Sequence, residues 1–143
     1  MSYHAVVVDI IVNRNAVYQT AYHVVWCPKY RSQILTGDVA NFLRQSLGEI
    51  CQERKWRITA LEIQPDHVHM FVSFPPAVSI AEAVKILKGS TARYLFTHFP
   101  EIRKRLRDGA LWSPSYYAGT AGQVSAEAIR RYIERTEHIR GRR

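Results

Sequence analysis

The chain of 143 residues carries 20 Lys and Arg against 12 Asp and Glu, giving a formal net charge of +8. This length suits one domain with its own core, and no apolar stretch reaches the length of a membrane span. The positive charge predicts a polyanionic partner. Because the basic residues are interleaved with Tyr and Trp instead of lining one amphipathic helix, nucleic acid is favoured over a membrane surface.

The N-terminus and the cysteines bear on the compartment. Residues 1–5 lack the basic start and small-residue cleavage site of a signal peptide. Cys27 and Cys51 are too few and too far apart for a zinc ribbon or a disulfide framework. We therefore expect a reduced, cytoplasmic setting.

The first elements in chain order are an arm and a strand. Residues 1–16 read as an irregular arm or short edge strand, and residues 18–27 alternate as a strand that Pro28 ends. Lys29 and Arg31 follow on either side of a tyrosine. Two cations and an aromatic at a strand end suit phosphate contact and base stacking, although a solvated basic loop is equally ordinary.

A helix and a strand pair come next. Apolar residues recur at spacings of three and four over residues 36–55, which predicts an amphipathic helix. Residues 56–64 read as a second strand. Pro65 and Asp66 form a tight turn that returns the strand of residues 67–74 beside it.

The strand of residues 67–74 contains two histidines separated by one apolar residue, His67 and His69. Successive strand side chains point to opposite faces, so the two imidazoles stand side by side, and the other face is wholly apolar and predicted to lie under helices. Neighbouring imidazoles make half of a divalent-metal site. Spacing alone leaves open the alternative of two histidines hydrogen-bonded in a half-exposed sheet.

The next helix is predicted to begin at Ser79, which forms a capping box with Glu82. Lys85 and Lys88 lie one turn apart on this helix, and Arg93 follows further along. These three side chains could grip a phosphate backbone, but a solvated helix face explains them as well.

The last third of the chain holds three further elements. Residues 101–107 predict a short helical turn, and residues 112–120 a fourth strand with a proline near its start. Ser125 is expected to cap a final helix over residues 123–139, which carries Tyr132, and a basic tail fills residues 140–143.

The order of elements is strand, helix, strand, strand, helix, strand, helix. That order predicts one α+β domain over residues 1–143: a ferredoxin-like (RRM-like) split βαβ sandwich with an antiparallel sheet and an added C-terminal helix.

Five motifs stand out along the chain: Tyr22-His23-Val24-Val25-Trp26-Cys27-Pro28-Lys29-Tyr30-Arg31, Pro65-Asp66-His67-Val68-His69, Leu87-Lys88-Gly89-Ser90-Thr91-Ala92-Arg93, Leu111-Trp112-Ser113-Pro114-Ser115-Tyr116 and Arg131-Tyr132-Ile133-Glu134. In content, order and spacing, over roughly residues 18–137, they resemble the single-tyrosine HUH transposases of bacterial and archaeal insertion sequences. The resemblance implies a homodimer that exchanges its C-terminal helices and cuts and rejoins single-stranded DNA with hairpin ends through a 5′-phosphotyrosine.

The resemblance also implies roles for individual residues. His67 and His69 match the metal ligands, and Tyr132 matches the nucleophile. Mg²⁺ or Mn²⁺ fits the phosphate chemistry best. Where the family usually has a glutamine ligand this chain has Thr136, so Glu137 or water could complete the shell, or the element has lost efficient cleavage.

Other interpretations stand beside this one. Tyr132 borders an apolar helical stripe, where packing is the ordinary role of a tyrosine. Tyr116, Tyr117 and Tyr94 are rival nucleophiles, although Tyr94 is expected on the buried stripe of its helix. A catalytically silent module that binds single-stranded nucleic acid is the alternative function, and only the enzyme forms a covalent adduct with DNA.

Overall fold

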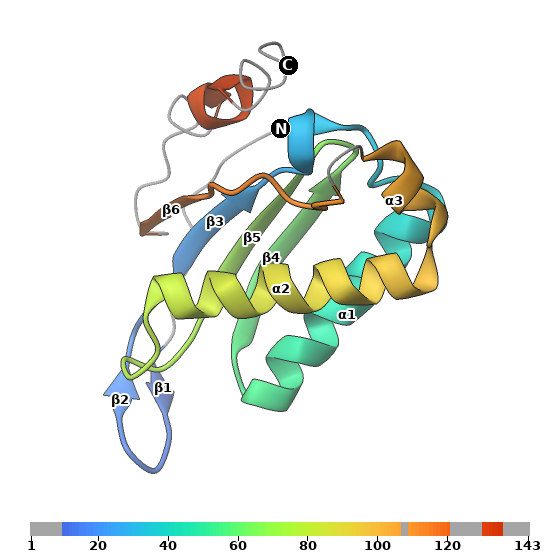
Figure 1. The fold of residues 1–143 in the computed structure, drawn as a ribbon. Coiled ribbons are helices and arrows are strands. Elements are labelled where there is room, and N and C mark those ends of the chain that lie inside the picture. Colours follow the sequence, from blue (N-terminus) through green and yellow to red (C-terminus); the bar gives the residue numbers. More distant parts are fainter. Residues whose placement is uncertain (1–9, 107–108, 121–129, 136–143) are drawn as a thin grey trace.

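The computed structural model describes residues 10–106, 109–120 and 130–135, and its centre is a four-stranded sheet (Figure 1). The strands are ordered β4-β5-β3-β6, and every neighbouring pair is antiparallel. Their bounds are β3 Tyr22–Trp26, β4 Arg57–Gln64, β5 His67–Ser73 and β6 Tyr117–Thr120. With the helices below, this confirms the predicted α+β class.

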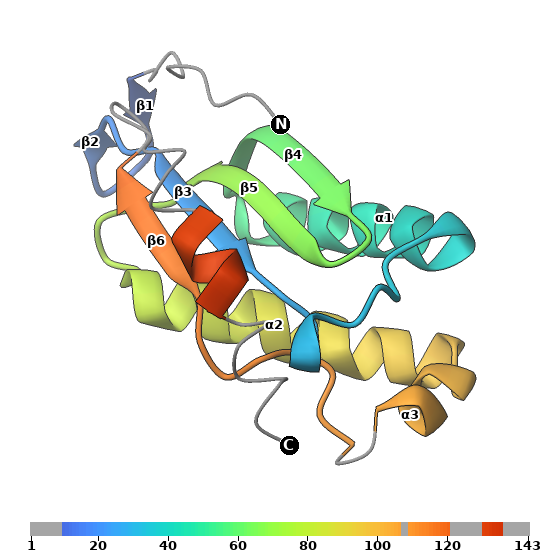
Figure 2. The same cartoon turned by 90° about the horizontal axis from the view of Figure 1, so that it is seen from above.

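Two long helices cover one face of the sheet (Figures 1 and 2). They are α1, Gly37–Arg54, and α2, Ile80–His98, and the shorter α3, Glu101–Arg105, follows α2. The predicted cap of α2 is present, because Oγ of Ser79 accepts a hydrogen bond from the amide of Glu82 at 3.0 Å. Ranges predicted from periodicity and capping therefore match these helices to within a few residues.

The main core lies between this helical layer and the sheet. Val68, Met70 and Val72 of β5 are fully buried there, as the alternation of that strand predicts. Apolar residues of α1 and α2 such as Leu47 and Leu87 close the same core. Each such side chain contributes about 1.5–3 kcal/mol by leaving water, so the sheet is a rigid base for whatever lies on its other face.

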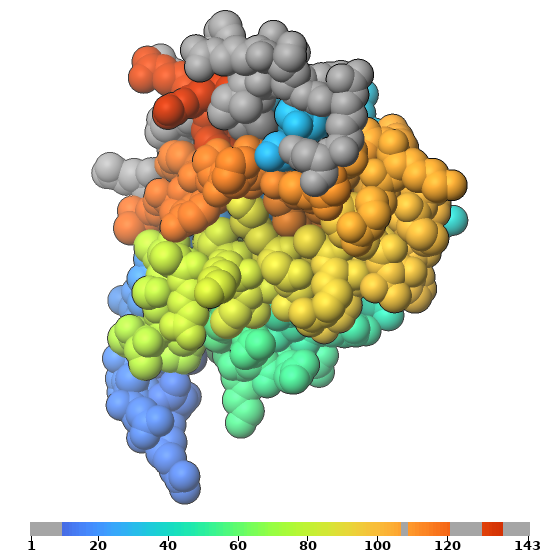
Figure 3. Space-filling model, viewed as in Figure 1, coloured from blue at the N-terminus to red at the C-terminus, as the bar shows by residue number. Residues whose placement is uncertain are grey.

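The predicted strand over residues 18–27 is interrupted. Val17–Tyr18, β2, pairs with Ile11–Val12, β1, in a separate hairpin that projects from the body of the protein (Figure 3). Oδ1 of Asn13 accepts hydrogen bonds from the backbone amides of Asn15 and Ala16 at 2.9 and 2.8 Å, and these bonds close the hairpin turn. This side-chain turn explains why part of the predicted arm forms a strand.

The predicted strand over residues 112–120 is also shorter than expected. Only Tyr117–Thr120 joins the sheet, and Trp112 makes an isolated bridge with Pro28. Between them, Pro114 has no amide hydrogen to donate, and the carbonyls of Ser113 and Ser115 accept hydrogen bonds from Nζ of Lys88. These groups are therefore not used in a strand ladder.

Two further expectations concern single residues and the chain ends. Tyr94 is 39% exposed, so its predicted burial on the stripe of α2 is wrong; its ring instead lies under the guanidinium of Arg93. Residues 130–135 are helical, whereas Ser125, Thr136 and the predicted tail of residues 140–143 lie outside the described residues. Within the described ranges, no helix combines the length and the hydrophobicity needed to cross a membrane.

Candidate active site

The face of the sheet opposite α1 and α2 holds a cluster of three histidines. His67 and His69 come from β5 and His23 from β3, and their exposed fractions are 7, 4 and 0%. The strand register pairs His69 with Val25 and Phe71 with His23. The histidine face is thus buried and not half-exposed, and the two predicted imidazoles lie beside a third.

His67 is oriented by a carboxylate. Its Nδ1 lies 2.8 Å from Oδ1 of Asp66, and Oδ2 of the same residue lies 2.6 Å from Nε of Arg31. The hydrogen bond to His67 and the contact with Arg31 outweigh burial and lower the pKa of Asp66 to about 2. Nε2 of His67 is buried and has no hydrogen-bond partner among the described residues.

His23 was not predicted as a site residue. Its ring lies 4.0 Å from that of His69 and stacks on Phe71 at 4.2 Å. Burial lowers the pKa of His23 to about 4, and burial, followed by the charges of His23 and His67, lowers the pKa of His69 to about 3. Both rings are therefore neutral at ordinary pH. Strand alternation could have found His23, because it shares a face with Val25 and not with Val24.

The donors present fit a divalent metal ion. A buried imidazole nitrogen without a partner, with a carboxylate on the other ring nitrogen, is the usual arrangement of a metal-binding histidine. In the described part of the chain no group of three or more His, Cys, Asp or Glu side chains could enclose a metal ion. His67 and His69 could thus supply part of a shell, and water or phosphate oxygens would have to supply more.

Tyr132 lies on the same face as the histidines. Its neighbour Ile133 forms a buried apolar cluster with Val25 of β3 and with Cys27, which directly follows this strand. Tyr132 and Tyr117 pack against this cluster. Figures 1 and 2 show residues 130–135 on the side of the sheet away from α2. The hydroxyl of Tyr132 donates to the carbonyl of Ser115 at 3.0 Å. The sheet therefore brings the predicted nucleophile and the predicted metal ligands to one face.

The rival tyrosines are placed differently. Tyr117 also reaches the histidines, since its ring meets that of His23 edge-on at 5.9 Å. Tyr116 is 36% exposed, and Tyr94 lies on α2 with the guanidinium of Arg93 over its ring at 5.3 Å. Position therefore leaves Tyr117 as the main competitor of Tyr132.

The predicted basic residues fall into two groups. Lys29 and Arg31 lie in the short helix η1, Lys29–Arg31, just after β3, where Arg31 adopts a positive φ of 54°. Lys85 and Arg93 are exposed on α2. Lys88 is half-buried, and its Nζ donates to the carbonyls of Ser113 and Ser115 at 2.7 and 3.1 Å.

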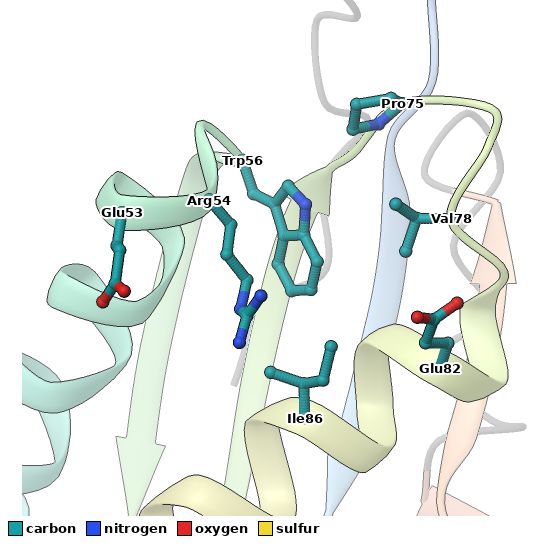
Figure 4. A pocket seen from close by; sticks show the side chains of 7 residues that line it. All are labelled: Glu53, Arg54, Trp56, Pro75, Val78, Glu82 and Ile86. Atoms are coloured by element: carbon teal, nitrogen blue, oxygen red, sulfur yellow. The ribbon is translucent and has the colours of Figure 1, made fainter.

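A surface pocket of about 340 Å³ lies away from these residues (Figure 4). It is bounded by the end of α1, the start of α2 and the end of β5, and Arg54 lies over the ring of Trp56 at 5.7 Å. None of the predicted site residues lines it. The histidines and Tyr132 lie on the opposite face of the sheet, away from this pocket.

Comparison with known proteins decides the family. The model of the family described as IS200-like transposase matches residues 16–136. The chain belongs to the IS200-like transposase family. This membership implies that the protein cleaves DNA and transfers strands.

Individual relatives agree with the assignment. The IS200-like chain is 38% identical over 134 residues to the ISDra2 transposase TnpA of Deinococcus radiodurans, covering 94% of this chain and 96% of that one. It is 32% identical over 113 residues to the transposase for insertion sequence element IS200 of Salmonella typhimurium, covering 79 and 74%.

Solved structures show the same fold. A crystal structure described as that of a transposase from Deinococcus radiodurans R1 matches this IS200-like transposase with a TM-score of 0.79 at 36% identity, covering 89 and 98% of the two chains. A REP-associated tyrosine transposase bound to a REP hairpin matches with a TM-score of 0.54 at 16% identity, covering 87 and 68%.

Proposed function

We propose that this IS200-like transposase cuts and rejoins single-stranded DNA at insertion-sequence ends through a 5′-phosphotyrosine on Tyr132, assisted by a divalent metal at His67 and His69. One observation carries the proposal: Ile133, next to Tyr132, packs on Val25, and Val25 is the register partner of His69. The motif that ends at His69 and the motif that begins at Arg131, 62 positions apart in the sequence, thus meet on one sheet face.

Each residue of the proposed site has its own role in forming the phosphotyrosine. A phenol with an ordinary pKa near 10 is a weak nucleophile at neutral pH, so the charge that develops during attack on phosphate must be stabilised. Mg²⁺ or Mn²⁺, when bound, would polarise a phosphate oxygen. Asp66 orients His67, and the buried sheet face excludes bulk water. The hydroxyl oxygen of Tyr132 attacks the phosphorus, so that a new Tyr O–P bond replaces the P–O3′ bond and the 3′ oxygen leaves as a free hydroxyl after taking up a proton.

The shell of the metal site needs more donors than the two histidines. Thr136 and Glu137, the candidates considered from the sequence, lie outside the described residues. Phosphate oxygens and water are the donors that Mg²⁺ keeps most readily. We therefore propose that the substrate itself supplies part of the shell.

The DNA contacts are proposed from charge and exposure. Lys85 and Arg93 are exposed on α2, and the partly buried Lys29 lies in η1 directly after the strand that carries His23, so these three are our candidates for phosphate contact. Arg31 and Lys88 already bind a carboxylate and two carbonyls. A hairpin-bearing single strand is the proposed ligand, and the distant structural relative that is bound to a REP hairpin shares the fold.

The architecture and assembly are proposed on similar grounds. The antiparallel order β4-β5-β3-β6 with two helices on one face supports a ferredoxin-like split βαβ sandwich to which residues 130–135 are added. We also propose a homodimer in which the C-terminal helices are exchanged, so that the contacts that Tyr132 and Ile133 make here within one chain would form between the two chains of the dimer. Light scattering should give twice the 16.5 kDa of one chain, and a monomer at micromolar concentration would contradict this assembly.

The test of the proposed function is covalency. A labelled single strand carrying the element's own end is incubated with Mg²⁺ or Mn²⁺ and the protein, and a denaturing gel separates any adduct. Wild type should give an adduct that Tyr132→Phe lacks and that a chelator prevents. If wild type binds the strand without forming an adduct, the chain is a silent binding module; if Tyr132→Phe still forms one, the nucleophile is another tyrosine.

A further inference from the structure

Lys88 and Tyr132 share one hydrogen-bond acceptor. The carbonyl oxygen of Ser115 accepts two hydrogen bonds, one from Nζ of Lys88 at 3.1 Å and one from the hydroxyl of Tyr132 at 3.0 Å. The hydroxyl of Ser115 also lies 3.4 Å from that of Tyr132. An ammonium group on α2 is therefore one shared atom away from the proposed nucleophile.

The segment that carries this carbonyl is held on α2 by several bonds around Lys88. Nζ of Lys88 also binds the carbonyl of Ser113 at 2.7 Å, and Nε1 of Trp112 donates to the carbonyl of Lys88 at 3.0 Å. On its other side the segment is tied to β3, since the amide of Ser113 donates to the carbonyl of Cys27 at 2.9 Å. Residues 112–115 thus link α2 to the strand that bears Val25.

The surroundings of Lys88 suit a structural bond better than a phosphate contact. The side chain is half-buried, and desolvation lowers the pKa of Lys88, against a small opposing effect of Cys27. To reach phosphate, Nζ would have to leave both carbonyls, and the carbonyl of the buried Ser113 would then lose its charged donor. Lys85, one turn earlier, is exposed and has no such cost.

We propose that Lys88 is a positioning residue for Tyr132: by holding the carbonyls of Ser113 and Ser115, it fixes the place of the tyrosine hydroxyl on the histidine face. This inference rests on the proposed function, in which Tyr132 is the nucleophile. Loss of a neighbour that places a reacting group can slow a reaction by about 100-fold even when binding is intact.

The experiment separates rate from affinity. Lys88→Met, Lys88→Arg and wild type are compared for the first-order rate of adduct formation at saturating single-stranded DNA and for the DNA dissociation constant as a function of salt. Lys104→Met, which removes one exposed charge of α3, controls for net charge. Thermal unfolding of each variant shows that the compared proteins are folded.

We expect Lys88→Met to lower the rate on the order of 10- to 100-fold with the dissociation constant and its salt slope unchanged. Lys88→Arg should recover much of the rate, because a guanidinium can donate to both carbonyls. A 3-fluorotyrosine at position 132 should also change its ¹⁹F resonance in folded Lys88→Met and return toward the wild-type position in Lys88→Arg.

Other results would overturn the inference. An unchanged or faster rate in folded Lys88→Met would show that Lys88 does not position the nucleophile. A weaker affinity with a flatter salt slope and an unchanged rate would make Lys88 a phosphate contact. These failures are distinct from failure of the proposed function, which would appear as a wild-type protein without a Tyr132-dependent adduct.

Discussion

Asp66 determines which ring nitrogen of His67 carries the proton. With a pKa lowered to about 2, Asp66 is ionised at neutral pH and can only accept hydrogen bonds. Nδ1 of His67, 2.8 Å from Oδ1 of Asp66, must therefore be the donor. In the neutral ring, this leaves the lone pair on the buried Nε2, which is the atom available to a metal ion.

Replacement of Asp66 should weaken metal binding. Asp66→Asn removes the charge that fixes the tautomer of His67 and loses the ion pair with Arg31 at 2.6 Å. We expect the affinity for Mn²⁺, measured by calorimetric titration, to fall about 10- to 100-fold. Asp38→Asn, on the exposed first turn of α1, is the matched control. Equal affinities in the two variants would show that Asp66 does not orient a metal ligand.

The third histidine should act through packing. His23 stacks on Phe71 and lies against His69, so His23→Phe keeps an aromatic ring in that place. We expect this variant to bind Mn²⁺ nearly as well as wild type, whereas the affinity of His69→Phe for Mn²⁺ should fall about 10-fold or more. A loss in His23→Phe as large as that in His69→Phe would instead make His23 a metal ligand.

The exposed lysine of α2 should contribute to DNA affinity through counterion release. Lys85→Gln should lower affinity for a hairpin-bearing single strand and reduce the slope of log affinity against log salt by about 0.7. Lys104→Gln, which changes net charge equally from α3, should leave that slope nearly unchanged. Fluorescence anisotropy over a salt series measures both, and identical slopes for Lys85→Gln and wild type would remove Lys85 from the interface.

A buried thiol should make stability depend on alkaline pH. Burial in the α1 core raises the pKa of Cys51 from 9.0 to about 12, against a smaller lowering effect of Arg54. Because the folded-state pKa is the higher one, the contribution of the thiol is complete below pH 9.0 and is lost as the pH rises toward 12.

The comparison that tests this is wild type against Cys51→Ala. Urea unfolding should show that the difference in the free energy of unfolding between wild type and Cys51→Ala decreases above pH 9.0 by up to about 1.4 kcal/mol per pH unit. Lysines and tyrosines titrate in both proteins, so their contributions cancel in this difference. An advantage that stays constant with pH would mean that Cys51 ionises without cost in the folded protein.

Local patterns predicted much of this fold and part of the site. The alternation of His67 and His69 against Val68 and Met70, and the capping box at Ser79, depend on neighbours in the sequence and are present in the structure. Long-range contacts were not predictable in this way. Lys88 binds carbonyls 25 and 27 positions away, which shortens β6, and His23 reaches His69 only across paired strands.

The central claim is that Tyr132 forms the covalent bond to DNA on the histidine face, and peptide mapping of the adduct tests it most directly. After nuclease trimming and trypsin digestion, mass spectrometry identifies the peptide that carries the nucleotide. The account predicts the modification on the peptide that begins after Arg131, at Tyr132. A nucleotide on Tyr117, the other tyrosine that packs on this face, or on Tyr116 or Tyr94, would contradict it.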